Sequence, residues 1–157
     1  NLAREIVSAD CSLVYGGGDV GLMGEISRET MRLGGRVYGV IPRGLFAKEI
    51  ASRKITRLYK VKDMHERKAK MEKLSDAFLA IPGGFGTMDE LFEIITWNQI
   101  GIHQKPVVLF NYQGFYDPLI LQLKLMVREG FISPYHFEML QVVTDLKNLR
   151  KLIRAFN

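Results

Sequence analysis

The sequence contains little cysteine and no long apolar run. Cys11 is the only cysteine among the 157 residues, which excludes an internal disulfide framework and favours a reducing compartment. No apolar run approaches the roughly 20 residues that a membrane-spanning helix needs. We therefore predict a soluble cytoplasmic protein that has no membrane partner.

Motifs for metals and large cofactors are also missing. The three histidines, His65, His103 and His136, lack metal-binding spacing, and one cysteine cannot complete a zinc site. No G-x-x-x-x-G-K-[ST] sequence is present, and the glycines of residues 16–24 differ in order from the dinucleotide pattern G-x-G-x-x-G. We predict neither a metal nor another cofactor.

The remaining composition is that of an ordinary globular domain, with 47% hydrophobic and 25% charged residues. The net charge is +5, and basic residues cluster at 53–62 and again at 67–73, where acidic residues are interleaved with the second cluster. An excess this small suits an anionic small substrate as well as nucleic acid. We favour the small substrate and predict no nucleic-acid partner.

The most informative stretch is residues 82–90, with the sequence PGGFGTMDE. It follows an apolar run at 77–81 that predicts a buried parallel strand, and it precedes an apolar pattern up to Trp97 that predicts a helix. Glycines let the backbone approach a ligand closely, and the first turn of a helix offers unpaired N–H groups. A strand, a glycine turn and a helix start therefore predict an anion site, most often one for phosphate.

A structural alternative exists for the same residues. Thr87 is followed three positions later by Glu90, which is the spacing of a capping box. In that case the two side chains would satisfy each other's backbone donors and would have no ligand.

The rest of the chain alternates strands with helices. A strand at 12–15, a glycine turn and a helix at 22–33 repeat the arrangement, with Gly17 and Gly18 in the turn. The patterns further predict strands at 36–41, 55–61 (an edge), 105–110 and 139–143, and helices at 2–7, 63–74, 118–129 and after Asp145. This order predicts an α/β fold with a mostly parallel sheet, as one domain over 1–157. Both glycine turns follow the carboxyl ends of strands, so we expect them to line one crevice.

Five segments together resemble the LOG (Lonely Guy) family of cytokinin-activating nucleoside 5′-monophosphate phosphoribohydrolases, long mislabelled as lysine decarboxylases. They are residues 15–18 (YGGG), 21–24 (GLMG), 39–42 (GVIP), 63–68 (DMHERK) and 82–90 (PGGFGTMDE). The resemblance implies a Rossmann-like three-layer sandwich and a homodimer or larger homo-oligomer with the pocket near the subunit interface. Members of the family open with a first strand and a Cys-Gly-Ser type loop, which this chain lacks, so we expect its beginning to be incomplete.

The resemblance also implies the site. It implies a catalytic pair at Arg67 and Glu90, and it implies substrate-binding residues at Glu49, Arg67, Lys68, Gly84, Phe85, Gly86, Thr87, Met88, Asp89, Glu90 and Thr96. To these we add Gly17 and Gly18 of the first glycine turn. The implied reaction cleaves the N-glycosidic bond of an adenine-type nucleoside 5′-monophosphate and releases free base and ribose 5-phosphate.

The residue types suit this chemistry. Cleavage develops positive charge on the ribose, which the Glu90 carboxylate can face while it activates water as general base. Gly84, Gly86 and Thr87 can hold the phosphate. Arg67 can contact either the phosphate or the departing base, and Glu49 suits the ribose hydroxyls.

Three alternatives remain open. A decarboxylase would need pyridoxal phosphate on a lysine, and no motif for that cofactor surrounds Lys68. The chain could be a catalytically silent nucleotide-binding module. It could also cleave AMP or a nucleotide of another base with no cytokinin role, since the phosphate motif would be unchanged.

Overall fold

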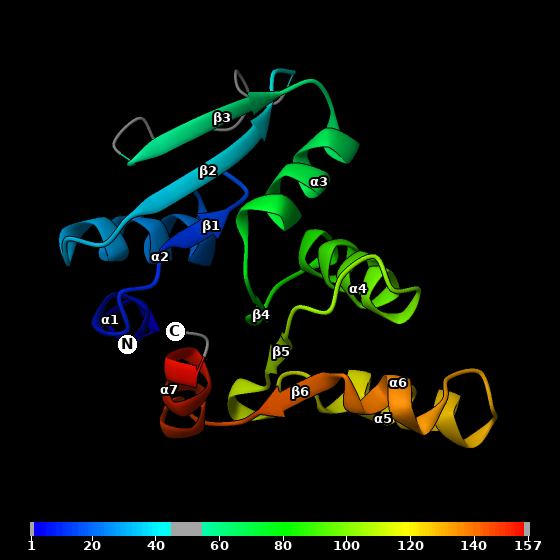
Figure 1. Cartoon of the computed structure of the whole chain (residues 1–157). Coiled ribbons are helices and arrows are strands. Elements are labelled where there is room, and N and C mark those ends of the chain that lie inside the picture. Colours follow the sequence, from blue (N-terminus) through cyan, green and yellow to red (C-terminus); the bar gives the residue numbers. More distant parts are fainter. Residues whose placement is uncertain (1, 45–54, 156–157) are drawn as a thin grey trace. The chain divides into compact units, whose positions relative to one another are not determined.

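The computed structural model describes residues 2–44 and 55–155 (Figure 1). Glu49 and the apolar positions beside it therefore lie outside the described residues. The chain divides into two compact units, which are Asn1–Ser75 with Arg150–Asn157, and Asp76–Leu149. We refer to them as the first and the second unit.

The first unit is a small parallel sheet with helices. Its elements are α1 (Leu2–Ser8), β1 (Leu13–Tyr15), α2 (Gly21–Arg32), β2 (Val37–Pro42), β3 (Arg57–Val61) and α3 (Met64–Leu74). The strand order is β1-β2-β3, with both pairs parallel and β3 at an edge as predicted. The helix α2 ends as predicted, because Gly34 has a φ of 81° and its N–H reaches the carbonyl of Met31.

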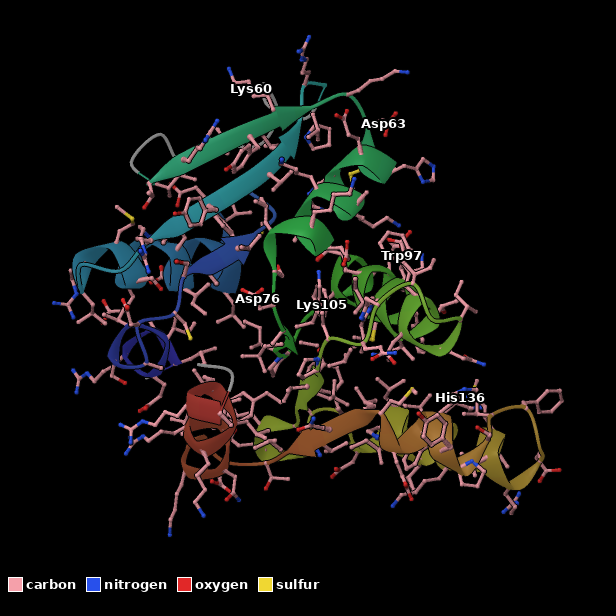
Figure 2. All side chains as sticks on the ribbon, viewed as in Figure 1. Lys60, Asp63, Asp76, Trp97, Lys105 and His136 are labelled. Carbon is pink, nitrogen blue, oxygen red and sulfur yellow. The ribbon has the colours of Figure 1, made fainter. Side chains whose placement is uncertain are left out.

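Two side-chain hydrogen bonds fix the start of α3. Asp63, which is labelled at the start of α3 in Figure 2, is the predicted N-cap. Its carboxylate accepts a 2.9 Å hydrogen bond from the N–H of Glu66. The Glu66 side chain in turn accepts a 2.6 Å hydrogen bond from the N–H of Lys62. The bond from Glu66 also lowers the pKa of Asp63. Further along α3, the ammonium of Lys70 lies 4.9 Å from the ring centroid of Tyr59, so this helix covers the Tyr59 face of the sheet.

The second unit repeats the parallel arrangement. Its elements are β4 (Phe78–Ala80), α4 (Phe85–Gln99), β5 (Val107–Phe110), a 3₁₀ turn η1 (Tyr112–Gly114), α5 (Asp117–Arg128), α6 (Pro134–Glu138) and β6 (Leu140–Val143). The strand order is β4-β5-β6, and both pairs are parallel. The helix α7 (Leu146–Ala155) follows, and Asp145 caps it as predicted through the N–H of Asn148 at 2.8 Å.

The core of the second unit lies between β5 and the helices. All four residues of β5 are buried, and Leu91 and Ile94 of α4 pack in the same cluster as Val107 and Leu109. The prediction that residues 77–81 form a buried strand is only partly right. The parallel strand is present, but its residues are half-buried because β4 is an edge of its three-stranded sheet.

A buried histidine ties α4 to the loop before β5. His103 is 6% exposed, and its Nε2 lies 3.0 Å from the carbonyl oxygen of Ile94. Its Nδ1 accepts a hydrogen bond from the N–H of Lys105 at 3.1 Å. An acceptor at Nδ1 and a carbonyl opposite Nε2 place the ring proton on Nε2. This histidine therefore has a structural role.

The fold is α/β with parallel sheets, as predicted. The two glycine turns follow the carboxyl ends of β1 and β4, which is where open α/β sheets bind ligands. Within the described part of the chain, none of the helices has the length and apolar character that crossing a membrane requires.

Candidate active site

The start of α4 decides between the two interpretations of residues 82–90. The N-cap is Gly84, and α4 begins at Phe85. Thr87 is therefore the third residue of the helix and Glu90 the sixth, so the capping-box alternative is wrong. The glycine at the N-cap supplies no side chain to the first turn. The first N–H groups of an α-helix have no acceptor within the helix, so they are available to an anion.

The turn between β4 and α4 is closely packed around Thr87. A β-carbon on Gly83 would overlap Oγ1 of Thr87 and would lie 2.9 Å from its Cβ. The threonine side chain thus lies directly over the backbone of Gly83, and only glycine fits there. Gly84, Phe85 and Gly86 are exposed, and Phe85 retains 97% of its accessible surface. The turn therefore offers an open backbone with a hydroxyl beside it.

Glu90 shares a helix face with this turn. It lies four residues after Gly86 and three after Thr87, and residues at these spacings are neighbours on a helix surface. Glu90 is half-buried, whereas Asp89 is exposed. Met88 points the other way, because it packs against the core cluster. The carboxylate of Glu90 is therefore well placed to act on a ligand at the turn.

Thr96 is not brought to the turn. It follows Thr87 by nine residues, which corresponds to about 14 Å along the helix axis. Its hydroxyl donates a 2.7 Å hydrogen bond to the carbonyl oxygen of Phe92 in the preceding turn of α4. In the second unit, Thr96 is thus separate from the residues of the glycine turn.

The first glycine turn is buried and closely approached. Gly16, Gly17 and Gly18 are all buried. Gly17 has a φ of 82°, and a β-carbon there would lie 3.2 Å from Cβ of Ile41. Glycine is needed at this position both for the left-handed backbone and for the lack of space.

Arg67 reaches this first turn from α3. Its Nε donates a 3.1 Å hydrogen bond to the carbonyl oxygen of Val40 in β2. A β-carbon on Gly16 would overlap Nη2 of Arg67 and would lie 3.0 Å from its Cζ. The guanidinium is therefore held against the glycine that follows β1 and against Val40 within β2. Gly16 was quoted in the YGGG motif but was not among the predicted site residues, although its place in a run of three glycines was a signal for close backbone approach.

Two further charged residues of the first unit are Lys68, on α3, and Asp19, in the first glycine turn. Lys68 follows Arg67 on α3 and is half-buried. Asp19, in the first glycine turn, forms an ion pair with Arg28 of α2, which also pairs with Glu25 at 2.5 Å. Arg28 is thus shared by two carboxylates, so it offsets only part of the negative charge of Asp19 and Glu25.

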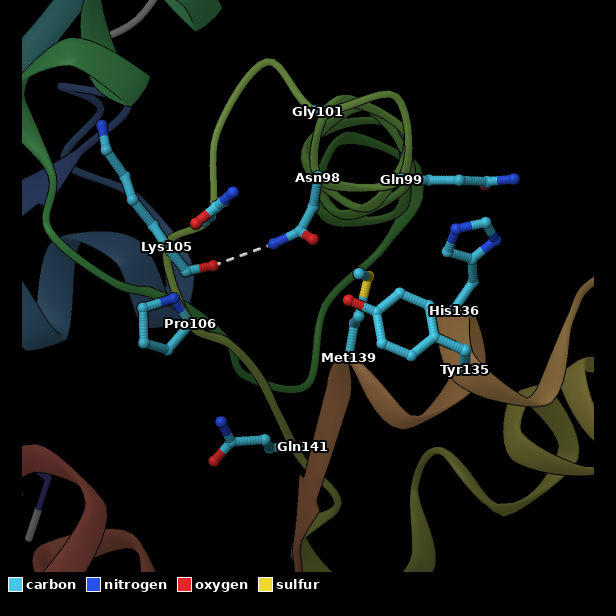
Figure 3. A pocket seen from close by; sticks show the side chains of 10 residues that line it. Asn98, Gln99, Gly101, Lys105, Pro106, Tyr135, His136, Met139 and Gln141 are labelled. Atoms are coloured by element: carbon cyan, nitrogen blue, oxygen red, sulfur yellow. Dashed lines mark hydrogen bonds between the residues drawn. The ribbon is translucent and has the colours of Figure 1, made fainter.

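A pocket lies elsewhere in the second unit (Figure 3). It has a volume of about 500 Å³, and it lies at the amino ends of β5 and β6, where Pro106 and Met139 precede the strands. Figure 3 shows Asn98 bonded to the carbonyl of Lys105, which is a 3.1 Å contact. The glycine turn follows the carboxyl end of β4, so this pocket is separate from the candidate site.

Metal ligands do not gather among the described residues. Over 2–44 and 55–155, no three His, Cys, Asp or Glu side chains come together as a metal ion would require.

Comparison with known proteins identifies the family. The family described as "Possible lysine decarboxylase" matches residues 23–153. The cytokinin riboside 5′-monophosphate phosphoribohydrolase LOG1 of Arabidopsis thaliana is 46% identical over 155 residues, which cover 99% of this chain and 73% of that protein. This chain belongs to the LOG family. A second LOG protein of that plant, LOG3, is 45% identical over 156 residues, with the same coverage of both chains.

Solved structures share the fold at much lower identity. The molybdenum cofactor carrier protein of Chlamydomonas reinhardtii matches with a TM-score of 0.71 and 20% identity, covering 99% of this chain and 83% of that one. The molybdenum cofactor binding protein of Rippkaea orientalis matches with a TM-score of 0.71 and 21% identity, covering 98% and 82%. These matches show that the LOG chain has a Rossmann-like fold.

Proposed function

We propose that this LOG protein hydrolyses the N-glycosidic bond of adenine-type nucleoside 5′-monophosphates, including cytokinin riboside 5′-monophosphates. The products are the free base and ribose 5-phosphate. The names of relatives that are 45–46% identical support the reaction class. The observation that carries the proposal is the N-cap of α4 at Gly84, since it shows that Thr87 and Glu90 do not form a capping box.

The 5′-phosphate binds at the second glycine turn in this proposal. The N–H groups at the start of α4 face it from Gly86 and Thr87, and the Thr87 hydroxyl adds a donor. The positive end of the helix dipole favours the dianion. Binding energy from the phosphate then positions the reacting bond, although the phosphate itself takes no part in the cleavage.

Glu90 and Arg67 are the catalytic pair. As the bond between C1′ and the base nitrogen breaks, its electron pair leaves with the base, and the Glu90 carboxylate stabilises the positive charge on the ribose. The same carboxylate takes a proton from the water whose oxygen attacks C1′, and this proton then passes to the departing base, which leaves as the neutral free base while the carboxylate is restored. Arg67 contacts the phosphate or the departing base with a guanidinium that Val40 orients.

The remaining members of the site contribute binding in this proposal. They are Gly17 and Gly18, Glu49, Lys68, Gly84, Phe85, Met88, Asp89 and Thr96. We further propose that residues 1–157 belong to one LOG-type domain, since the family match at 23–153 includes parts of both units.

A product assay tests the reaction. The purified protein is incubated with AMP, with isopentenyladenosine 5′-monophosphate and with the two corresponding nucleosides, and free base is separated by chromatography. Base released from the monophosphates but not from the nucleosides is the expected result. The preferred base then ranks cytokinin activation against AMP breakdown. No release from any nucleotide would contradict the proposal and favour a silent binding module.

Two further features belong to the proposal. The protein forms a homodimer or larger homo-oligomer, which the exposed apolar side chains at and after the end of α4, Ile100 at 63% and Ile102 at 60%, support. Sedimentation of the wild type and of an Ile100→Ser, Ile102→Ser variant tests this, and a monomeric wild type would contradict it.

We also propose a cytoplasmic location, as one half-buried cysteine suits a reducing compartment.

A further inference from the structure

Tyr116 contacts the segment that leads into the second glycine turn. It is 3% exposed, and its hydroxyl donates a 2.6 Å hydrogen bond to the carbonyl oxygen of Ile81. Ile81 is the first residue after β4 and directly precedes the turn at 82–87. We propose that Tyr116 is a positioning residue, whose hydroxyl holds this turn in the shape that binds the 5′-phosphate. The inference rests on the proposed function.

The carbonyl of Ile81 needs such a partner. The ladder between β4 and β5 ends at the pair of Ala80 with Leu109, so Ile81 lies just beyond it. Pro82 follows and has no N–H group, so it cannot continue the ladder. Ile81 is half-buried, and the Tyr116 hydroxyl gives its carbonyl a hydrogen-bond donor at the point where the glycines begin.

The tyrosine itself is held by a second residue that the sequence analysis missed. Asn111 is 4% exposed and follows β5; its Oδ1 accepts a 2.7 Å hydrogen bond from the N–H of Tyr116. Its Nδ2 donates to the carboxylate of Asp117 at 2.7 Å, and its own N–H donates to the carbonyl of Val143 in β6 at 2.7 Å. Asn111 thus connects the ends of β5 and β6 to Tyr116.

Aromatic packing restricts the ring further. The ring of Phe115 packs edge-on against Tyr116 with the centroids 4.9 Å apart. Burial raises the pKa of Tyr116, so its hydroxyl stays protonated and remains a donor around neutral pH. Because the N–H of Tyr116 is bonded to Asn111 and its ring packs against Phe115, the ring cannot follow a displacement of the turn. The hydrogen bond to Ile81 therefore fixes the start of the glycine turn relative to β5 and β6.

Tyr116→Phe removes only the hydroxyl and tests this role. We expect the KM for the nucleoside 5′-monophosphate to rise about tenfold with a smaller change in kcat, since the phosphate anchor is displaced. We also expect the amides of Gly83 and Gly84 to exchange with solvent about tenfold faster in NMR experiments, with those of β5 unchanged. Tyr112→Phe is the matched control, because it changes a 47% exposed tyrosine of the same segment.

The outcomes separate this inference from the proposed function. An unchanged KM and unchanged exchange at the turn would overturn it, and so would faster exchange throughout the second unit, which indicates general destabilisation. If the wild type releases no base from any nucleotide, the proposed function fails. The exchange at Gly83 and Gly84, together with calorimetric binding of ribose 5-phosphate, then still decides whether Tyr116 holds a phosphate-binding turn.

Discussion

The guanidinium of Arg67 occupies the space that a β-carbon on Gly16 would need. Nη2 would overlap that carbon, and Nε of the same side chain donates to the carbonyl of Val40 at 3.1 Å. The arginine is thus oriented by the ends of two strands and by the absence of a side chain between them. A substitution at Gly16 can therefore displace the guanidinium while Arg67 itself is unchanged.

Replacing Gly16 by alanine should displace Arg67. The overlap is with the far end of a flexible side chain, so we expect little loss of thermal stability. A misplaced catalytic group should nevertheless lower kcat/KM by about 100-fold. Gly44→Ala is the matched control, since a β-carbon at Gly44 meets none of the described residues within 4 Å. Normal kinetics of the Gly16→Ala enzyme would show that the position of Arg67 does not matter for turnover.

Replacing Arg67 by lysine should also impair the enzyme. An ammonium keeps the charge but cannot reproduce a planar fork that contacts Val40 through Nε while it contacts a ligand. We expect kcat/KM to fall by about 100-fold or more. Kinetics with the 5′-monophosphate measure this, and adding Gly16→Ala to Arg67→Lys should cost little more, because both changes disturb one group. Full activity of the lysine variant would reduce Arg67 to a surface residue.

Asp63 with Glu66 and Thr87 with Glu90 have the same spacing, but alanine at Asp63 and alanine at Thr87 should change the thermal stability by different amounts. Asp63→Ala removes a real N-cap and should lower the melting temperature by about 2 to 4 °C. Thr87→Ala removes no cap and should stay within about 2 °C of the wild type, while it weakens binding of the 5′-monophosphate. Thermal melts and nucleotide titrations check both. Equal destabilisation by the two changes would restore the capping interpretation of Thr87.

Glu5 should make stability depend on pH in acid. Its side chain is 6% exposed, and its carboxylate accepts hydrogen bonds from Nε and Nη2 of Arg150 at 2.6 and 2.7 Å. The hydrogen bond from Arg150 lowers the pKa of Glu5 below its unfolded value of about 4.3. The stabilisation is therefore complete above that value and is lost as the pH falls through the folded-state pKa.

Melting curves of Glu5→Gln against the wild type test this dependence. We expect the variant to melt about 2 to 4 °C lower near pH 7, with the difference shrinking below about pH 4. Glu25→Gln is the control, because Glu25 and Arg28 form an exposed pair whose loss should have little effect. A difference between Glu5→Gln and wild type that is constant from pH 7 to pH 3 would contradict the account.

Most elements of the fold could be predicted from the sequence, because they depend on local patterns. Gly34 ends α2, Asp63 begins α3, and the apolar run before Asn111 forms β5. The short helix α6 was missed, since its five residues are too few for a periodic pattern. Its signal was Ser133 before Pro134, where the serine accepts from the N–H of His136.

The site was predictable to a smaller extent. The glycine turns were visible as motifs, but Thr87 with Glu90 has the same local spacing as Asp63 with Glu66. Only the position of the first helical residue separates a cap from a ligand site. Contacts of Arg67 with Gly16 and of Tyr116 with Ile81 join residues far apart in the chain, and no local pattern encodes them.

The rate of base release by the Glu90→Gln variant tests the central claim most directly. Glutamine keeps the size of the side chain at the sixth residue of α4 but removes the carboxylate charge. With AMP or isopentenyladenosine 5′-monophosphate, kcat should fall by about 100-fold or more, while the melting temperature and nucleotide binding stay near those of the wild type. A Glu90→Gln variant that releases base at the wild-type rate would contradict the assignment of Glu90 as the catalytic carboxylate.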